Sequence, residues 1–156
     1  MEMQMKVEKH LEELNITLPE PAIPVASYVP YKIIDKMLYI SGQGPMIKGK
    51  PQYTGKVGRD VSFEDAYQSA RLCGLNLIAL MKNALGDLDR VEQIVHLKGY
   101  VACTDDYTDQ PRVINGASDL MIEVFGEAGK HTRCALGTNS LPVAIPTEVE
   151  VIVKIY

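Results

Sequence analysis

The chain has 156 residues and a mass of 17.3 kDa, so residues 1–156 are expected to form a single domain. Hydrophobic residues make up 46% and charged residues 23%, close to the average for globular proteins, which argues against collagen, coiled coil and a disordered chain. The formal net charge is −4 and the basic residues are scattered. A nucleic acid is therefore not expected as the main partner, because its phosphates require clustered Lys and Arg.

No stretch approaches the ~18 consecutive apolar residues of a membrane span, and residues 1–15 are too charged for a secretion signal. The three cysteines include no Cys-x-x-Cys pair, and the three histidines stand far apart. Neither a disulfide framework nor a metal site is predicted from this spacing. We expect a cytoplasmic protein without a membrane partner.

The first elements are short. Val7, Leu11 and Leu14 share one helical face and predict a helix, which the prolines of the following linker, residues 19–24, would end. Residues 27–34 and 37–40 read as two strands of a hairpin with its turn at 35–36. A loop rich in Gly and Pro comes next, and residues 52–57 are a candidate short strand.

Two longer helices and a strand follow. Apolar and small residues at spacings of 3 and 4 predict a helix over 63–85, which begins near Ser62 and stops at Gly86. Residues 91–103 read as a strand. Pro111 suits the first turn of a second helix that continues to about residue 125.

The last predicted strands cover residues 132–138 and 148–156. In the final strand Val149, Val151 and Val153 share one face, and Glu148 and Glu150 the other. The order of elements predicts an α+β fold, with an antiparallel or mixed sheet and its helices packed on one face.

Nucleophile-elbow, phosphate-loop and dinucleotide motifs are absent from the sequence. Arg133, beside small apolar residues, is a candidate for binding a carboxylate through its planar fork, although a surface or ion-paired Arg is an open alternative. Glu148 could activate a water or decorate the strand edge. Cys134 fits a packing residue better than a nucleophile. His131 could serve near Arg133, but a lone loop histidine is usually just solvated.

Several segments in register resemble the YjgF/Rid family (reactive intermediate/imine deaminases, also described as L-PSP endoribonuclease-like or translation initiation inhibitor-like proteins). The segments are Ser27-Tyr28-Val29-Pro30, Leu38-Tyr39-Ile40-Ser41-Gly42-Gln43, Val113-Ile114-Asn115, Arg133, Leu141-Pro142 and Glu148-Val149-Glu150. The resemblance covers roughly residues 22–156. Residues 1–21 would then be an N-terminal extension that forms an added helix.

The resemblance implies a chorismate mutase-like sheet with two helices on one face, assembled as a homotrimer with ligand clefts between adjacent subunits. It implies hydrolytic deamination of small enamine or imine acids, of the 2-aminoacrylate type, to 2-keto acids and ammonia, without a cofactor. Arg133 would bind the substrate carboxylate and Glu148 would hold the attacking water. The other residues implied in the cleft are Tyr28, Ser41, Gly42, Asn115 and Cys134.

The chain also departs from the deaminase pattern. Cys134 precedes by one residue the position of the usual cysteine, where Ala135 stands, and His131-Thr132 replaces the usual Pro-Ala before the arginine. These differences bear on the substrate and on whether the chain is an enzyme. A non-catalytic, chaperone-like module that binds a small carboxylate in the same cleft, and an endoribonuclease, are the two alternatives.

Overall fold

The computed structural model describes residues 6–21, 24 and 26–156. Parts of the expected N-terminal extension and of the proline linker (residues 1–5, 22, 23 and 25) lie outside the described residues. The helices are α1 (Lys6–Glu13), α2 (Phe63–Leu85) and α3 (Gln110–Phe125), with the short 3₁₀ turns η1 (Leu88–Arg90), η2 (Gly126–Gly129) and η3 (Pro142–Ala144). The strands are β1 (Tyr31–Ile34), β2 (Met37–Gln43), β3 (Met46–Ile47), β4 (Lys50–Pro51), β5 (Val91–Ala102), β6 (Thr132–Thr138) and β7 (Thr147–Ile155).

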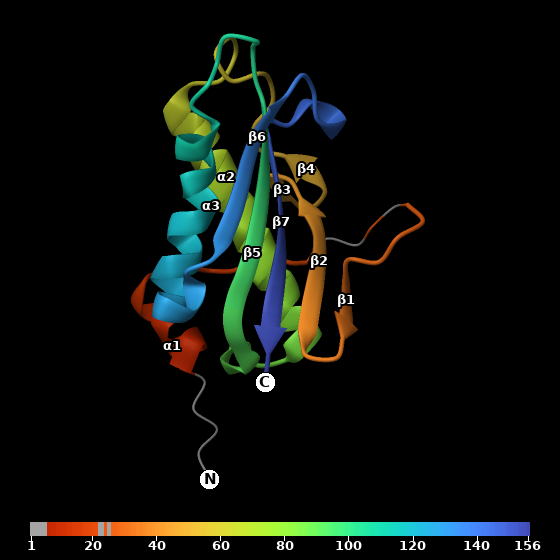
Figure 1. Cartoon of the computed structure of the whole chain (residues 1–156), viewed down its shortest axis with the longest axis vertical. Helices are drawn as coiled ribbons and strands as arrows, with labels where there is room; N and C mark the ends of the chain where they lie inside the picture. The colour runs from red at the N-terminus through yellow and green to blue at the C-terminus, as the bar shows by residue number, and fades with distance from the viewer. Residues whose placement is uncertain (1–5, 22–23, 25) are drawn as a thin grey trace.

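Five strands form one sheet in the order β1-β2-β7-β5-β6, and α2 and α3 lie against the same side of it (Figure 1). All neighbouring strands are antiparallel except β5 and β6, which are parallel. The connection between these two strands contains α3, as parallel neighbours require a crossover. The predicted α+β class, with helices on one face of a mixed sheet, is confirmed.

Most of the expected elements form where the patterns place them. The hairpin turns at Asp35, with a φ of 54°, and α2 spans the predicted residues. At the start of α2 the backbone N–H of Asp65 donates to the Ser62 hydroxyl at 3.1 Å, which satisfies one of the free N–H groups of the first turn. At its end the N–H of Gly86 donates to Lys82 O at 2.8 Å.

The predicted strand over 52–57 is wrong. The chain instead forms the two-residue strands β3 and β4, which turn at Lys48 and Gly49, both with positive φ. Of the expected strand only Val57 makes bridges, to Val61 and Cys103. Glycine tolerates the left-handed turn, so the chain turns at residues 48–49 and pairs before residue 52.

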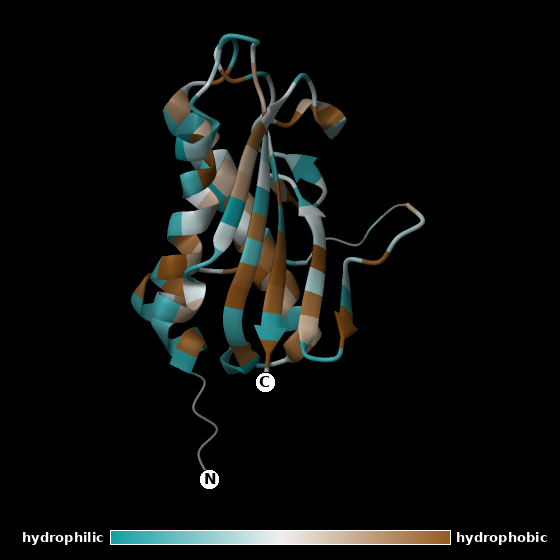
Figure 2. Cartoon of the chain, viewed as in Figure 1, coloured by the Kyte–Doolittle hydropathy of each residue, from teal (hydrophilic) through white to brown (hydrophobic). Residues whose placement is uncertain are grey.

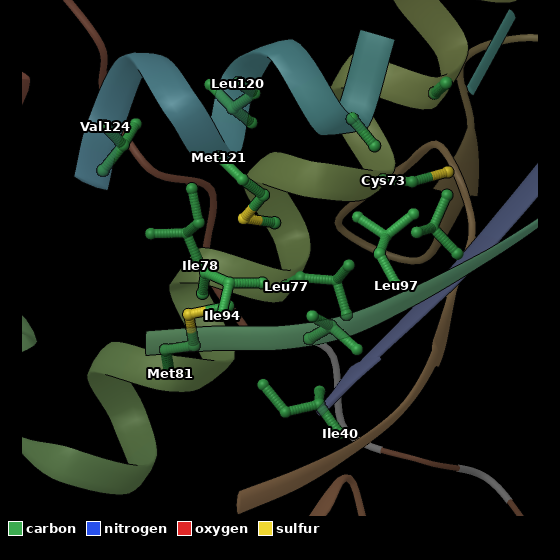
Figure 3. Close-up of a cluster of buried hydrophobic side chains, with 14 of the residues drawn as sticks. Ile40, Cys73, Leu77, Ile78, Met81, Ile94, Leu97, Leu120, Met121 and Val124 are labelled. Carbon is green, nitrogen blue, oxygen red and sulfur yellow. The ribbon is translucent and has the colours of Figure 1, made fainter. Parts of the chain in front are cut away.

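The hydrophobic core lies between the sheet and the two long helices. Figure 3 shows side chains of α2 and α3 pointing toward those of β2 and β5. The labelled members are Ile40, Cys73, Leu77, Ile78, Met81, Ile94, Leu97, Leu120, Met121 and Val124. Burial of this apolar surface is the main force that fixes α3 on the sheet, and α3 carries two of the polar residues described below.

The short helix α1 is fixed to the outside of the domain. The backbone N–H groups of Lys6 and Val7 each donate to a carboxylate oxygen of Asp89, both at 2.9 Å, and a carboxylate at a helix N-terminus is a favourable arrangement. His10 donates from Nε2 to the carbonyl of Glu123 at 2.7 Å. The described part of the N-terminal extension therefore contains the expected helix, bound to η1 and α3.

The sheet has two different faces. Leu97 and Val151 lie on the side covered by α2 and α3, which we call the helix face, and are buried. Alternate residues lie on the opposite side, which we call the open face, and there Tyr39 and Leu136 are exposed. Figure 2 shows the matching alternation of hydrophobic and hydrophilic residues along the central strands. In the described part of the chain, no helix is both long enough and apolar enough to cross a membrane.

Candidate functional site

Arg133 lies on β6, the edge strand beside β5, and its side chain reaches α3 on the helix face. The guanidinium is half-buried. Its Nη1 donates to Asn115 Oδ1 at 2.7 Å and to Ser118 Oγ at 3.2 Å. Both partners are neutral, and within the described residues Arg133 takes part in no salt bridge. A partly buried cation with neutral partners is suited to an anionic ligand.

The geometry of this contact leaves one side of the guanidinium available. Nη1 carries two hydrogens, and Asn115 and Ser118 accept one each. Neither Nε nor Nη2 donates to another of the described residues. These two nitrogens present parallel N–H groups, the arrangement that binds both oxygens of a carboxylate.

His131 lies beside this group and is not a solvated loop residue. Its Nδ1 is 2.6 Å from the carbonyl of Gly129 and its Nε2 is 2.9 Å from Ser118 Oγ. Burial lowers the pKa of His131 below its usual value, and the neighbouring Arg133 and His96 lower it further. The ring is therefore neutral near pH 7. The interpretation of His131 as merely solvated is wrong, because the chain folds its loop back over α3.

Glu148 lies at the start of β7 on the open face. It is half-buried, and burial, followed by the neighbouring Glu150 carboxylate, raises its pKa above the usual value. Gly42 packs against it, since a Cβ built on Gly42 would be 2.9 Å from Glu148 Oε2. A carboxyl group with a raised pKa is a stronger base than an ordinary Glu carboxylate, which suits it to proton transfer.

The remaining candidate residues fall into separate positions. The Ser41 hydroxyl donates to Val29 O at 2.7 Å, and so fixes the segment that contains Tyr28, whose own side chain is exposed. Cys134 follows Arg133 in an extended strand, so its side chain lies on the open face, beside Lys98 in the register. Arg133 and Asn115 are brought together on one face, and Glu148 and Gly42 on the other.

Within one chain, Arg133 and Glu148 are therefore not placed to contact the same small ligand. Arg133 lies on the helix face at the sheet edge, and Glu148 lies on the open face of the strand two positions away. A cavity of about 440 Å³ between α1 and α2 is lined by neither residue. A ligand that touches both side chains requires a second copy of the chain.

The family model described as "YjgF/chorismate mutase-like, putative endoribonuclease" matches residues 8–154. The chain belongs to the YjgF family. It is 39% identical over 151 residues to Protein TCP17 of Trypanosoma cruzi, covering 96% of this chain and 94% of that one. This confirms the family that the segments in register suggest, and with it the chorismate mutase-like fold.

Solved structures of other proteins share this fold. The protein Atu1372 from Agrobacterium tumefaciens, of unknown function, is 44% identical and superposes with a TM-score of 0.89, over 96% of this chain and 92% of that one. Escherichia coli TdcF with bound serine is 20% identical with a TM-score of 0.66, over 90% and 96% of the two chains, and shares the fold. Members of the YjgF family are generally homotrimers that bind small molecules.

Ser118 is a residue that the sequence reasoning did not single out. It lies three positions after Asn115 on α3, and residues three apart share a helix face. The spacing could therefore have pointed to Ser118 in the sequence, once Asn115 was a candidate. The contact of His131 with Ser118 had no such signal, because it depends on how η2 returns the chain to the start of β6.

Proposed function

We propose that this YjgF-family protein is a deaminase of small enamine and imine acids, which releases 2-keto acids and ammonia. The single observation that carries the proposal is the half-buried guanidinium of Arg133, which among the described residues has only neutral partners and a free pair of N–H donors. That pair suits the carboxylate of a small acid. The serine bound in TdcF is a ligand of this chemical kind.

The reaction is balanced with water as the only co-reactant. Protonation of the enamine carbon gives an imine, water adds to its C=N carbon, and ammonia leaves as the C=O bond forms. Glu148 is proposed to hold the water and to take its proton, a role to which its raised pKa is suited. Arg133 binds the carboxylate in substrate and product alike, and so contributes mainly to affinity.

The separation of Arg133 and Glu148 on opposite faces leads us to propose a homotrimer whose clefts combine residues of adjacent subunits. Arg133 and Asn115 would come from one subunit. The cleft would also be lined by five further residues: Glu148, Gly42, Ser41, Tyr28 and Cys134. The same separation favours a second candidate, a protein that binds a small carboxylate at Arg133 without catalysis.

A coupled assay tests the proposal. A threonine dehydratase releases 2-aminocrotonate, and the rate of 2-oxobutanoate formation is followed with and without the purified protein. We expect the wild type to accelerate 2-oxobutanoate formation. In Arg133→Ala the acceleration should fall at least tenfold, because the substrate carboxylate no longer has the forked guanidinium to bind. The matched control is Arg59→Ala, which removes an exposed arginine that pairs with Asp60 and should leave the acceleration unchanged.

Two outcomes would separate the candidates. Acceleration that persists in Arg133→Ala contradicts the role of this arginine. No acceleration by the wild type, together with calorimetric binding of 2-oxobutanoate that Arg133→Ala removes, establishes the binding protein instead.

A further inference from the structure

Three side chains and one carbonyl form a continuous chain of hydrogen bonds next to the candidate site. It runs from Gly129 O through His131 and Ser118 to Nη1 of Arg133. The members come from η2, the short connection after it, α3 and β6, segments that only the tertiary fold brings together. His131 and Ser118 do not reach the proposed position of the ligand; they act on Arg133.

The direction of each hydrogen bond follows from the donors and acceptors. A carbonyl oxygen only accepts, so Nδ1 of His131 carries a hydrogen and donates to Gly129 O. In a neutral imidazole the other nitrogen is then an acceptor, so the Ser118 hydroxyl donates to Nε2. With its hydrogen committed to His131, the hydroxyl oxygen turns its lone pairs toward Arg133.

We propose that His131 and Ser118 are a positioning pair for Arg133, which directs Nε and Nη2 of its guanidinium toward the carboxylate of the ligand. This rests on the proposed function. Asn115 alone holds one hydrogen of Nη1 and leaves the guanidinium free to turn about that contact. The second contact, from Ser118, removes this freedom, and His131 fixes the orientation of the Ser118 hydroxyl. A donor held in its binding direction loses less entropy on binding.

The charged and titratable groups around His131 agree with a neutral ring. Arg133 faces it from β6 and His96 from β5, and both disfavour a second positive charge. The Gly129 carbonyl favours a proton on Nδ1, which the neutral form already holds there. Protonation of Nε2 would make it a donor, and two cationic groups would then donate to one hydroxyl oxygen.

The first test requires no ligand. Nitrogen-15 NMR of the full-length wild type should show His131 with hydrogen on Nδ1 and an unprotonated Nε2 at pH 7, and a titration midpoint below about 6.5. In Arg133→Gln this midpoint should rise, because a neighbouring positive charge is removed. A ring protonated on Nε2 at pH 7, or a midpoint that Arg133→Gln does not change, would overturn the proposal.

The second test measures binding of 2-oxobutanoate by calorimetry. Ser118→Ala should weaken binding by about tenfold, a loss of about 1.4 kcal/mol, and in the coupled assay should raise KM with little change in kcat. Ser118→Thr, which keeps a hydroxyl, should recover most of the affinity. The matched control is Thr132→Val, which removes the hydroxyl that pairs with the other nearby imidazole, His96 Nδ1, at 2.8 Å, and should bind as the wild type does.

The two tests distinguish the proposals. If the wild type binds 2-oxobutanoate and Ser118→Ala binds it equally well, the positioning pair is wrong and the carboxylate site stands. If the wild type binds no 2-keto acid, the proposed function fails, and the NMR measurement still decides whether His131 and Arg133 are coupled.

Discussion

Glu148 and Arg133 are charged side chains held half-buried, and within the described residues neither forms a salt bridge. Partial burial of a charge opposes folding unless a partner compensates it. Arg133 is compensated in part by two neutral oxygens on α3, whereas Glu148 has the additional repulsion of Glu150. Groups kept in an unfavourable state by the fold are candidates for function.

For Glu148 the sign of the pH effect is determined by its raised pKa. The folded state binds the proton more tightly than the unfolded chain, so the stabilisation from this group is complete below the unfolded pKa of about 4.3. It is lost as pH rises through the folded pKa. At neutral pH the wild type therefore carries the cost of a half-buried carboxylate, which Glu148→Gln removes.

We accordingly expect Glu148→Gln to have an unfolding temperature at pH 7 equal to or above that of the wild type, with a difference that shrinks toward pH 4. Its rate of 2-keto acid release should fall by about 10²-fold, since the group that takes the proton is gone. Thermal unfolding at a series of pH values and the coupled assay measure the two effects. Glu92→Gln, on β5 and paired with Lys154 at 3.4 Å, is the control; marked destabilisation of Glu148→Gln at pH 7 would contradict the burial cost.

At the level of elements, the close approach of α2 and α3 decides where Asn115 and Ser118 lie. Gly116, between them in sequence, meets the backbone of α2: a Cβ there would be 2.1 Å from Tyr67 O. Gly74 on α2 similarly faces Leu120 and Ala117. Small residues at the crossing let the helices approach, and the position of the Arg133 partners follows from it.

Gly116→Ala should therefore push α3 away from α2. The gain in helix propensity, about 1 kcal/mol, is smaller than the cost of the clash, and we expect a net destabilisation of about 1–3 kcal/mol with weaker binding of 2-oxobutanoate. Urea unfolding at equal protein concentration and calorimetry test this. Ile122→Ala, at an exposed position of α3, should change stability by no more than about 0.5 kcal/mol; an equally stable Gly116→Ala would show that the helices can separate freely.

The elements were more predictable than the contacts between them. The helix over 63–85 follows from its apolar spacing and from the stop at Gly86, both local signals, and β7 from strict alternation. The β3–β4 hairpin was missed because its strands are two residues long and its turn depends on the backbone angles of Lys48 and Gly49. Arg133 was a candidate from its small apolar neighbours and again from the family resemblance, Asn115 from the resemblance alone, and the structure adds that they touch. The contact of His131 with Ser118 depends on packing and has no local signal.

At the scale of the whole molecule, the open face of the sheet is the main unexplained surface of a single chain. Ile34, Tyr39 and Leu136 are exposed there, at 51%, 44% and 50%. Large apolar side chains left exposed on one face of a sheet are expected to be covered by association. The proposed trimer would cover them, and would bring Glu148 of one subunit near Arg133 of another.

Leu136→Lys tests this arrangement, because it places a charge among the exposed apolar side chains of the open face, which the proposed trimer would cover. We expect the wild type to have a mass by light scattering of about 52 kDa, three times the 17.3 kDa of the chain, and the variant to shift toward a monomer. The variant should also lose 2-keto acid release, although Arg133 and Glu148 are unchanged in it. Ile122→Lys is the matched control: Ile122 has a similar exposure, 41%, but lies on α3, away from the open face, and should leave the mass at about 52 kDa. A monomeric wild type that still releases 2-keto acid would show that Arg133 and Glu148 do not need to meet across subunits.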